Sequence, residues 1–277
     1  MTRTRDGLPV CVAVLTLMGW AVAVAPVVAA DGPTCSLPAD HAGLRLPVER
    51  IPNAWQCRLA PIVTDFTTAN KIGPVMTPLP LSLYRYLLDH PPVAAALVNR
   101  LELGLHKAEV SAPGRYWLTD GEGTEGQLEL VLEARQGERT LRLYYLEGTH
   151  DGRFLPAVAG RAVVLLSFNA AMDERAAPAT ETTMVAYLQV PNRMLAGLLS
   201  LVRPFVGQVV LRQVGKAFDT AAGLAHVMRE DPARVLFEAA DPPAIAQDAI
   251  AVLQAELSAR HNSVPDTRPT PAGTTSR

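Results

Sequence analysis

The chain has few cysteines and almost no excess of either charge, and its small net charge excludes one class of partner. Only three of its 277 residues are cysteines, and 25 basic against 27 acidic residues leave a formal net charge of -2. Because neutralising phosphates requires a basic excess, no nucleic acid is expected as a partner. The abundant component is apolar: 49% of the residues are hydrophobic, which is too many for a disordered chain and suits one compact domain with additions, or two small domains.

The motifs of common catalytic and metal sites are also missing. The sequence contains no H-E-x-x-H zinc motif, no G-x-S-x-G nucleophile elbow and no P-loop lysine motif. Residues 121–126 match the dinucleotide pattern G-x-G-x-x-G, but a strand is expected after them, where a helix would have to face the phosphates. We therefore predict a hairpin loop, with weak calcium binding as the alternative. No metal, no cofactor and no catalytic residue is assigned.

The N-terminus has the three parts of an export signal. Arg3 and Arg5 precede an apolar run over residues 8–30, which ends in small residues. We predict a signal peptide over residues 1–30, cleaved after Ala30, and hence an exported protein that is periplasmic or secreted. The apolar run is also long enough to cross a bilayer, so a retained membrane anchor is the alternative.

The segment after the signal carries the two remaining cysteines and eight prolines. In an oxidising compartment, Cys35 and Cys57 are predicted to form a disulfide, with two free thiols or a metal pair as alternatives. Because proline removes backbone donors, we predict that residues 31–80 are an irregular, disulfide-pinned segment without long helices. One strand is expected there, over residues 62–67.

An α+β core is predicted over residues 81–232. Two short helices, starting near Ser82 and Pro92, precede about five strands that form an antiparallel meander. The strands are expected to be half-buried, each with one apolar and one wet face. The apolar residues that should share a face are Leu128, Leu130 and Leu132 in one strand, and Leu141, Leu143 and Tyr145 in the next.

Helices are expected to complete the chain. A long helix is predicted over residues 193–230, bent near Pro204, and its first half, residues 194–211, is more apolar than one buried face requires. A shorter C-terminal helix is expected within residues 233–261, and residues 262–277 are expected to be disordered. The apolar face of that shorter helix consists of Ile245, Ala249, Leu253 and Leu257.

This order of two short helices, a meander and a long helix resembles the helix-grip arrangement of the START-like superfamily of lipid-transfer and polyketide-cyclase proteins. The resemblance covers about residues 62–231, including the helix expected over residues 83–89. It implies an antiparallel meander curved around a long C-terminal helix, with an apolar cavity between them. No functional residue of the superfamily can be carried over to this chain.

The leading hypothesis is an exported, non-enzymatic protein that binds a lipid or other apolar small molecule in this cavity. One alternative is a cell-envelope interaction protein that uses residues 194–211 as its interface, and contact of these residues with a membrane surface is left open. Another is a cyclase- or hydrolase-type enzyme with a polar cluster of Arg142, Tyr144 and His150. The candidate ligand-binding residues are Trp117, Tyr145, Phe168, Tyr187, Leu198 and Phe205.

Overall fold

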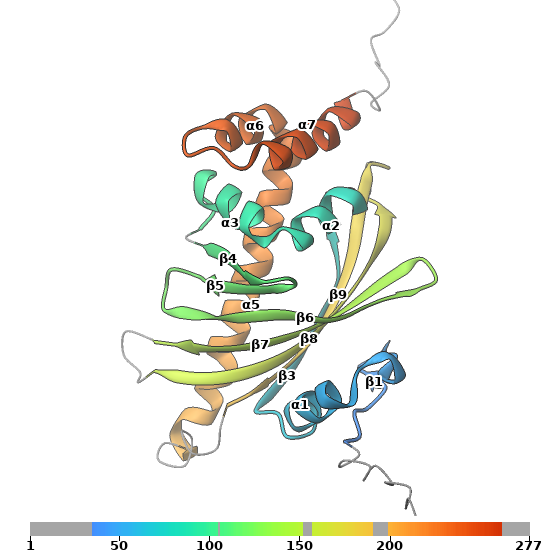
Figure 1. Cartoon of the computed structure of the whole chain (residues 1–277), viewed down its shortest axis with the longest axis vertical. Helices are drawn as coiled ribbons and strands as arrows, with labels where there is room; N and C mark the ends of the chain where they lie inside the picture. Colours follow the sequence, from blue (N-terminus) through green and yellow to red (C-terminus); the bar gives the residue numbers. More distant parts are fainter. Residues whose placement is uncertain (1–34, 105, 152–156, 191–198, 262–277) are drawn as a thin grey trace, which may run out of the picture. The chain divides into compact units, whose positions relative to one another are not determined.

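A computed structural model describes the backbone of residues 35–104, 106–151, 157–190 and 199–261, and their side chains except in 199–214 and 259–261. The predicted signal peptide, its membrane-anchor alternative and the predicted disordered tail lie outside these residues, as does Leu198. The described chain is α+β, with a seven-stranded antiparallel sheet and several helices (Figure 1).

The segment expected to be irregular contains a helix and a strand, so that expectation was wrong. Its elements are β1 (Asp40–His41), β2 (Leu44–Arg45), the 3-10 helix η1 (Val48–Arg50), α1 (Asn53–Thr64) and β3 (Thr68–Thr77). Pro52 immediately precedes α1 and Pro61 lies in its last turn, so proline breaks little of the helix. The strand expected over residues 62–67 is absent: residues 62–64 end α1, and residues 65–67 connect it to β3. In β3, Pro74 lies at a bulge between Ile72 and Val75.

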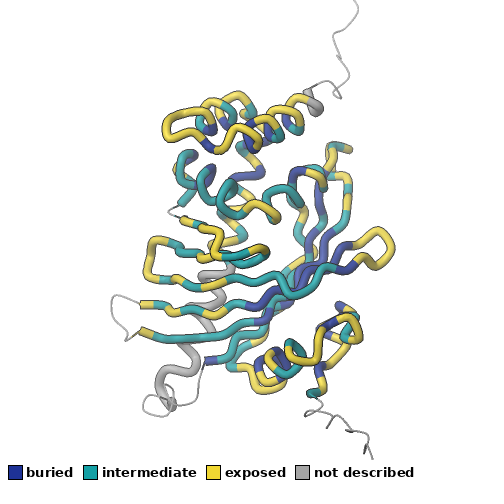
Figure 2. Tube along the Cα trace, in the orientation of Figure 1, coloured by how far each residue is buried: buried dark blue, intermediate teal, exposed yellow. Residues whose placement is uncertain are grey.

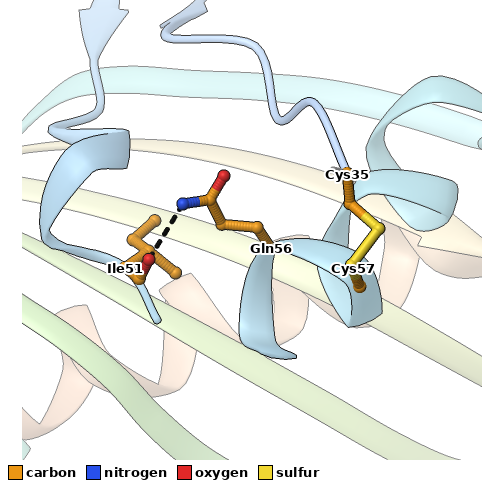
Figure 3. Close-up of a disulfide and its surroundings, with 4 residues drawn as sticks. All are labelled: Cys35, Ile51, Gln56 and Cys57. Carbon is orange, nitrogen blue, oxygen red and sulfur yellow. Dashed lines mark hydrogen bonds between the residues drawn. A yellow bond between two sulfur atoms is a disulfide. The ribbon is translucent and has the colours of Figure 1, made fainter. Parts of the chain in front are cut away.

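The predicted disulfide is confirmed. Cys35 and Cys57 are joined by a 2.01 Å bond, which ties the start of the described chain to α1 (Figure 3). Next to it, the Gln56 side chain donates hydrogen bonds of 2.9 and 3.0 Å to the carbonyl oxygens of Ile51 and Val48. The bond and these contacts fix the loop before α1 to the helix.

The antiparallel meander is also confirmed, with six strands in place of about five. These strands are β4 (Lys107–Ala112), β5 (Arg115–Thr119), β6 (Thr124–Gln136), β7 (Arg139–His150), β8 (Val158–Met172) and β9 (Pro178–Gln189). The sheet order is β3-β9-β8-β7-β6-β5-β4, so β3 pairs with the last strand of the meander. The G-x-G-x-x-G segment lies in the connection from β5 into β6, as expected for a hairpin loop.

Each face of the sheet buries apolar side chains, so the expectation of one wet face was wrong. The N-terminal face packs under residues 37–63, and its buried side chains are Leu141, Leu143, Tyr145, Val163, Leu165 and Val185. The opposite side, called here the helix face, carries buried Tyr144, Leu166 and Phe168 and packs against α2 (Leu81–Asp89). Figure 1 shows α1 in front of the sheet and α5 (Leu199–Glu230) passing behind it.

A bulge also corrects the predicted alternation in β6. The register shifts between Leu130 and Leu132, so Leu128 and Leu130 lie on the helix face whereas Leu132 packs with the N-terminal face. Because side chains alternate with period two, one extra residue moves every later side chain to the other face. In β7, which has no such shift against β8, Leu141, Leu143 and Tyr145 share a face as predicted.

A separate core holds the helices together. It joins α2, α3 (Pro91–Arg100), the end of α5, α6 (Pro232–Ala240) and α7 (Gln247–His261). The predicted apolar face of α7 is buried in this core, together with Ile245 just before it. The helix α5 is 32 residues long but is not the last of the chain, because Asp231 caps a new helix that begins at Pro232. No helix among the described residues is long and apolar enough to span a membrane.

An ion pair connects the end of α5 to the turn between β8 and β9. Arg229 donates to Asp173, whose other oxygen accepts 2.9 Å hydrogen bonds from the backbone N–H groups of Arg175 and Ala177. The backbone bond from Ala177, followed by the contact with Arg229, holds the pKa of Asp173 below its ordinary value near 3.8.

The lowered pKa predicts a stability change in acid. The stabilisation is complete above the ordinary carboxyl pKa and is lost as the pH falls through the lower pKa of the folded state. We expect Asp173→Asn, which keeps an oxygen acceptor, to flatten the fall in thermal midpoint between about pH 5 and pH 2 relative to the original protein. Parallel midpoint curves for the two proteins would contradict this assignment.

Three glycines form a row across the helix face. Gly148 of β7 pairs with Gly126 of β6 and with Gly160 of β8. A Cβ atom on Gly148 would lie 2.3 Å from the carbonyl oxygen of Glu125 and 2.9 Å from the Cα atom of Gly126. Here β6 and β7 approach each other more closely than a side chain allows.

The close approach predicts that Gly148→Ala destabilises the protein. Overpacking of this kind costs about 1–3 kcal/mol, which urea unfolding would measure. Gly215→Ala in α5 is the control, because no atom lies within 4 Å of the added Cβ and alanine favours a helix. An unchanged unfolding free energy for Gly148→Ala would show that the strands separate easily at this position.

Candidate functional site

A buried arginine organises the polar end of the helix face. Arg142 of β7 is 2% exposed, and its Nε atom donates to Glu133 at 2.7 Å. One Nη atom donates to Asp89 at the end of α2 at 2.6 Å, and the other donates to the Tyr144 hydroxyl at 3.4 Å. Burial alone would lower the pKa of Arg142, but Tyr144, Asp89 and Glu133 together raise it, so the guanidinium remains charged.

A second arginine makes the cluster electrically neutral. Arg85 of α2 donates to Glu133 at 2.7 Å and to the Thr140 hydroxyl at 3.4 Å. The two arginines thus face two carboxylates, Asp89 and Glu133, and all three nitrogens of Arg142 already have partners. Such a cluster fixes α2 to the sheet and leaves no surplus positive charge for an anion.

Two tyrosines lie beside this cluster. Tyr144 is 8% exposed, and Tyr84 of α2 packs against Phe168 with ring centroids 5.5 Å apart. The hydroxyl of Thr182 donates to the Tyr84 hydroxyl at 3.1 Å. Burial raises the pKa of both phenols, so both stay protonated at neutral pH. The polar end of the helix face therefore carries uncharged O–H groups.

Beyond the tyrosines, the helix face is apolar but incompletely covered. Its half-buried side chains are Leu128, Leu130, Leu146, Val164 and Met184. In β7, residues 141–145 are buried and none from 146 onward is, and Figure 2 shows this change along the strand. On the N-terminal face, the buried apolar side chains of these strands are Leu141, Leu143, Tyr145, Val163 and Leu165, and the β7 residues beyond them, Glu147 and Thr149, are exposed.

A second polar pair lies at the far end of this apolar stretch. The Thr124 hydroxyl and His150 Nδ1 are 2.9 Å apart. Along β7, six residues separate His150 from Tyr144, a distance of about 20 Å. The structure therefore brings together Arg142 and Tyr144 of the polar cluster proposed for an enzyme, but it places His150 elsewhere.

The candidate ligand-binding residues are not gathered in one place. Phe168 lies on the helix face, whereas Tyr145 and Tyr187 lie on the N-terminal face. Trp117 is 38% exposed on β5. Phe205 lies in the part of α5, residues 199–214, whose side chains are not described, and Leu198 falls outside the described residues. These residues are aromatic, but aromatic character does not tell which face of the sheet a side chain lies on. In β7 and β8, even-numbered and odd-numbered residues lie on opposite faces.

Sequence reasoning missed Tyr84, Asp89 and Glu133, although a signal existed for one of them. The two-residue turn between Gln136 and Arg139 sets the register that pairs Glu133 with Arg142. Opposite charges at such a cross-strand position stabilise a sheet. The contribution of α2 depends on tertiary packing and has no comparable signal in the sequence.

Other parts of the described chain offer weaker candidates for a binding site. A pocket of about 290 Å³ is lined by Asn99, His106, Lys107, Thr119 and Gly121. Its Asn99 amide is occupied by hydrogen bonds with the backbone of His106. Within the described residues, no three His, Cys, Asp or Glu side chains are grouped to hold a metal ion.

Comparison with protein-family models and with curated proteins finds no match for this chain.

Proposed function

We propose that this chain is an exported, non-enzymatic protein that binds a lipid or other apolar small molecule between the helix face and α5. The observation that carries the proposal is the half-buried group of apolar side chains beyond Tyr144, on the face of the sheet opposite the core formed with residues 37–63. A ligand that covers them would gain about 25 cal/mol for each Å² of apolar surface removed from water.

The strand order supports the helix-grip part of the proposal. From β3 onward, one strand, two helices and six further strands precede α5, and β3 pairs with β9. This adds β3 to the element order on which the START-like resemblance rests. In the proposed arrangement, the sheet curves around α5, and the close approach of β6 and β7 at Gly126 and Gly148 supports a bend there.

The disulfide supports the export part of the proposal. Bonded cysteines persist in oxidising compartments and are rare where thiols are kept reduced. We propose that residues 1–30 direct the chain to such a compartment, the periplasm or the extracellular space.

Mass spectrometry of an organic extract of the purified protein tests the proposed function. We expect one class of apolar molecule at a substantial fraction of the protein concentration, and saturable uptake of a fluorescent acyl probe by protein stripped of that molecule. An empty extract with no uptake would contradict the proposal. A concentration-dependent dimer in the same preparation would favour the interface role of residues 194–211.

A charge on the helix face should remove this binding. We expect Val164→Asp to weaken probe binding by at least tenfold, because a buried carboxylate lacks a partner there. The matched control is Val110→Asp, since Val110 is 64% exposed on the edge strand β4. Circular dichroism and thermal midpoints of both variants would separate lost binding from lost folding.

A further inference from the structure

The hydroxyl groups of the two tyrosines in the polar cluster each make one hydrogen bond to the protein, in which the phenol oxygen accepts. Arg142 donates to the Tyr144 oxygen, and Thr182 donates to the Tyr84 oxygen, so in both hydrogen bonds the phenol oxygen accepts. Among the described side chains and backbone, the Tyr144 phenol proton has no acceptor within hydrogen-bond distance, and the Tyr84 phenol has only the Thr182 hydroxyl. Even if the bond between Tyr84 and Thr182 ran the other way, one hydroxyl proton of that pair would remain unused. A buried donor without an acceptor is costly, and Tyr144 is only 8% exposed, so its hydroxyl favours binding of an acceptor.

Tyr144 lies at the boundary between the covered and the open parts of the helix face. Along β7 it is followed on this face by Leu146, and across the sheet it pairs with Leu130 and Val164. These three neighbours are all half-buried. A molecule lying on the apolar stretch would therefore have one end beside Tyr144.

The charges nearby decide which chemical group can occupy that end. Arg142 and Arg85 are balanced by Asp89 and Glu133, and each nitrogen of Arg142 is already engaged. A ligand carboxylate would find no unpaired cation there to offset the loss of its hydration. A neutral oxygen acceptor does not meet this obstacle.

We infer that the ligand is an uncharged amphiphile, such as an ester, a ketone or an alcohol of a long apolar chain, whose oxygen accepts hydrogen bonds from Tyr144 and Tyr84. This inference rests on the proposed function and specifies the ligand class of the same site. The apolar chain extends from Tyr144 toward His150, along about 20 Å of β7.

A matched ligand series tests the inference. Methyl palmitate, palmitate and hexadecane compete against a pyrene-labelled acyl methyl ester for the stripped protein. We expect methyl palmitate to bind about fivefold to tenfold more tightly than hexadecane, the contribution of one or two neutral hydrogen bonds, and also more tightly than palmitate. Tyr144→Phe should abolish the preference for the ester over hexadecane and leave hexadecane binding unchanged, and Tyr84→Phe should reduce the preference.

Tyr145→Phe is the matched control, because this neighbouring phenol donates to Glu147 on the opposite side of the sheet. It should retain the full preference for the ester. Equal binding of all three ligands, tightest binding of palmitate, or a preference that survives Tyr144→Phe would each overturn the inference while leaving apolar binding intact. If none of the three ligands binds, the proposed function fails together with the inference.

Discussion

Replacing Arg142 with methionine is expected to lower the free energy of unfolding by about 3 kcal/mol. The substitution keeps an unbranched apolar chain but removes the cation that joins Asp89 of α2 to Glu133 of β6. Both carboxylates are partly exposed and can recruit water, so the loss should fall at the low end of the range for a broken buried pair. Urea unfolding measures the change directly.

A surface arginine on the same strand provides the control. Arg139 pairs with Glu181 at 3.5 Å, and the two side chains are 59% and 30% exposed. Exposed pairs contribute little, so Arg139→Met should cost less than about 1 kcal/mol. If both variants lost the same stability, the cluster around Arg142 would not be what fixes α2 to the sheet.

Removing the disulfide is the second change with a large expected effect. The double variant Cys35→Ser, Cys57→Ser should lose about 3 kcal/mol of unfolding free energy, because the bond closes a loop between residues 22 positions apart. Chemical unfolding with and without dithiothreitol measures the loss. Reductant should bring the original protein to the level of the double variant and leave that variant unchanged. Insensitivity of the original protein to reductant would show that packing alone holds residues 35–57 in place.

The sequence was most informative where local chemistry determines structure. The alternation of Leu141, Leu143 and Tyr145 marked a strand and its buried face, and the short turn after Gln136 placed the hairpin. The disulfide followed from counting cysteines. In each case, neighbours in the sequence carry the information, as they do in strands and tight turns.

Features that depend on distant parts of the chain were missed. The alternation in β7 predicts that Thr140 and Arg142 lie on a wet face, because nothing local shows that α2 covers them. The bulge that turns Leu132 to the other face is likewise invisible in the alternation. In the N-terminal segment, the proline count obscured α1, since proline at the edges of a helix costs little.

The central claim places an apolar ligand on the helix face, and nuclear Overhauser effects between ligand and protein methyl groups test it most directly, because they require close contact. A long-chain methyl ester is added to stripped, methyl-labelled protein. We predict such effects at Leu146, Val164 and Met184, and none at Leu143 and Leu165 beneath the N-terminal segment. Effects confined to other surfaces, or equal on both faces of the sheet, would contradict the account.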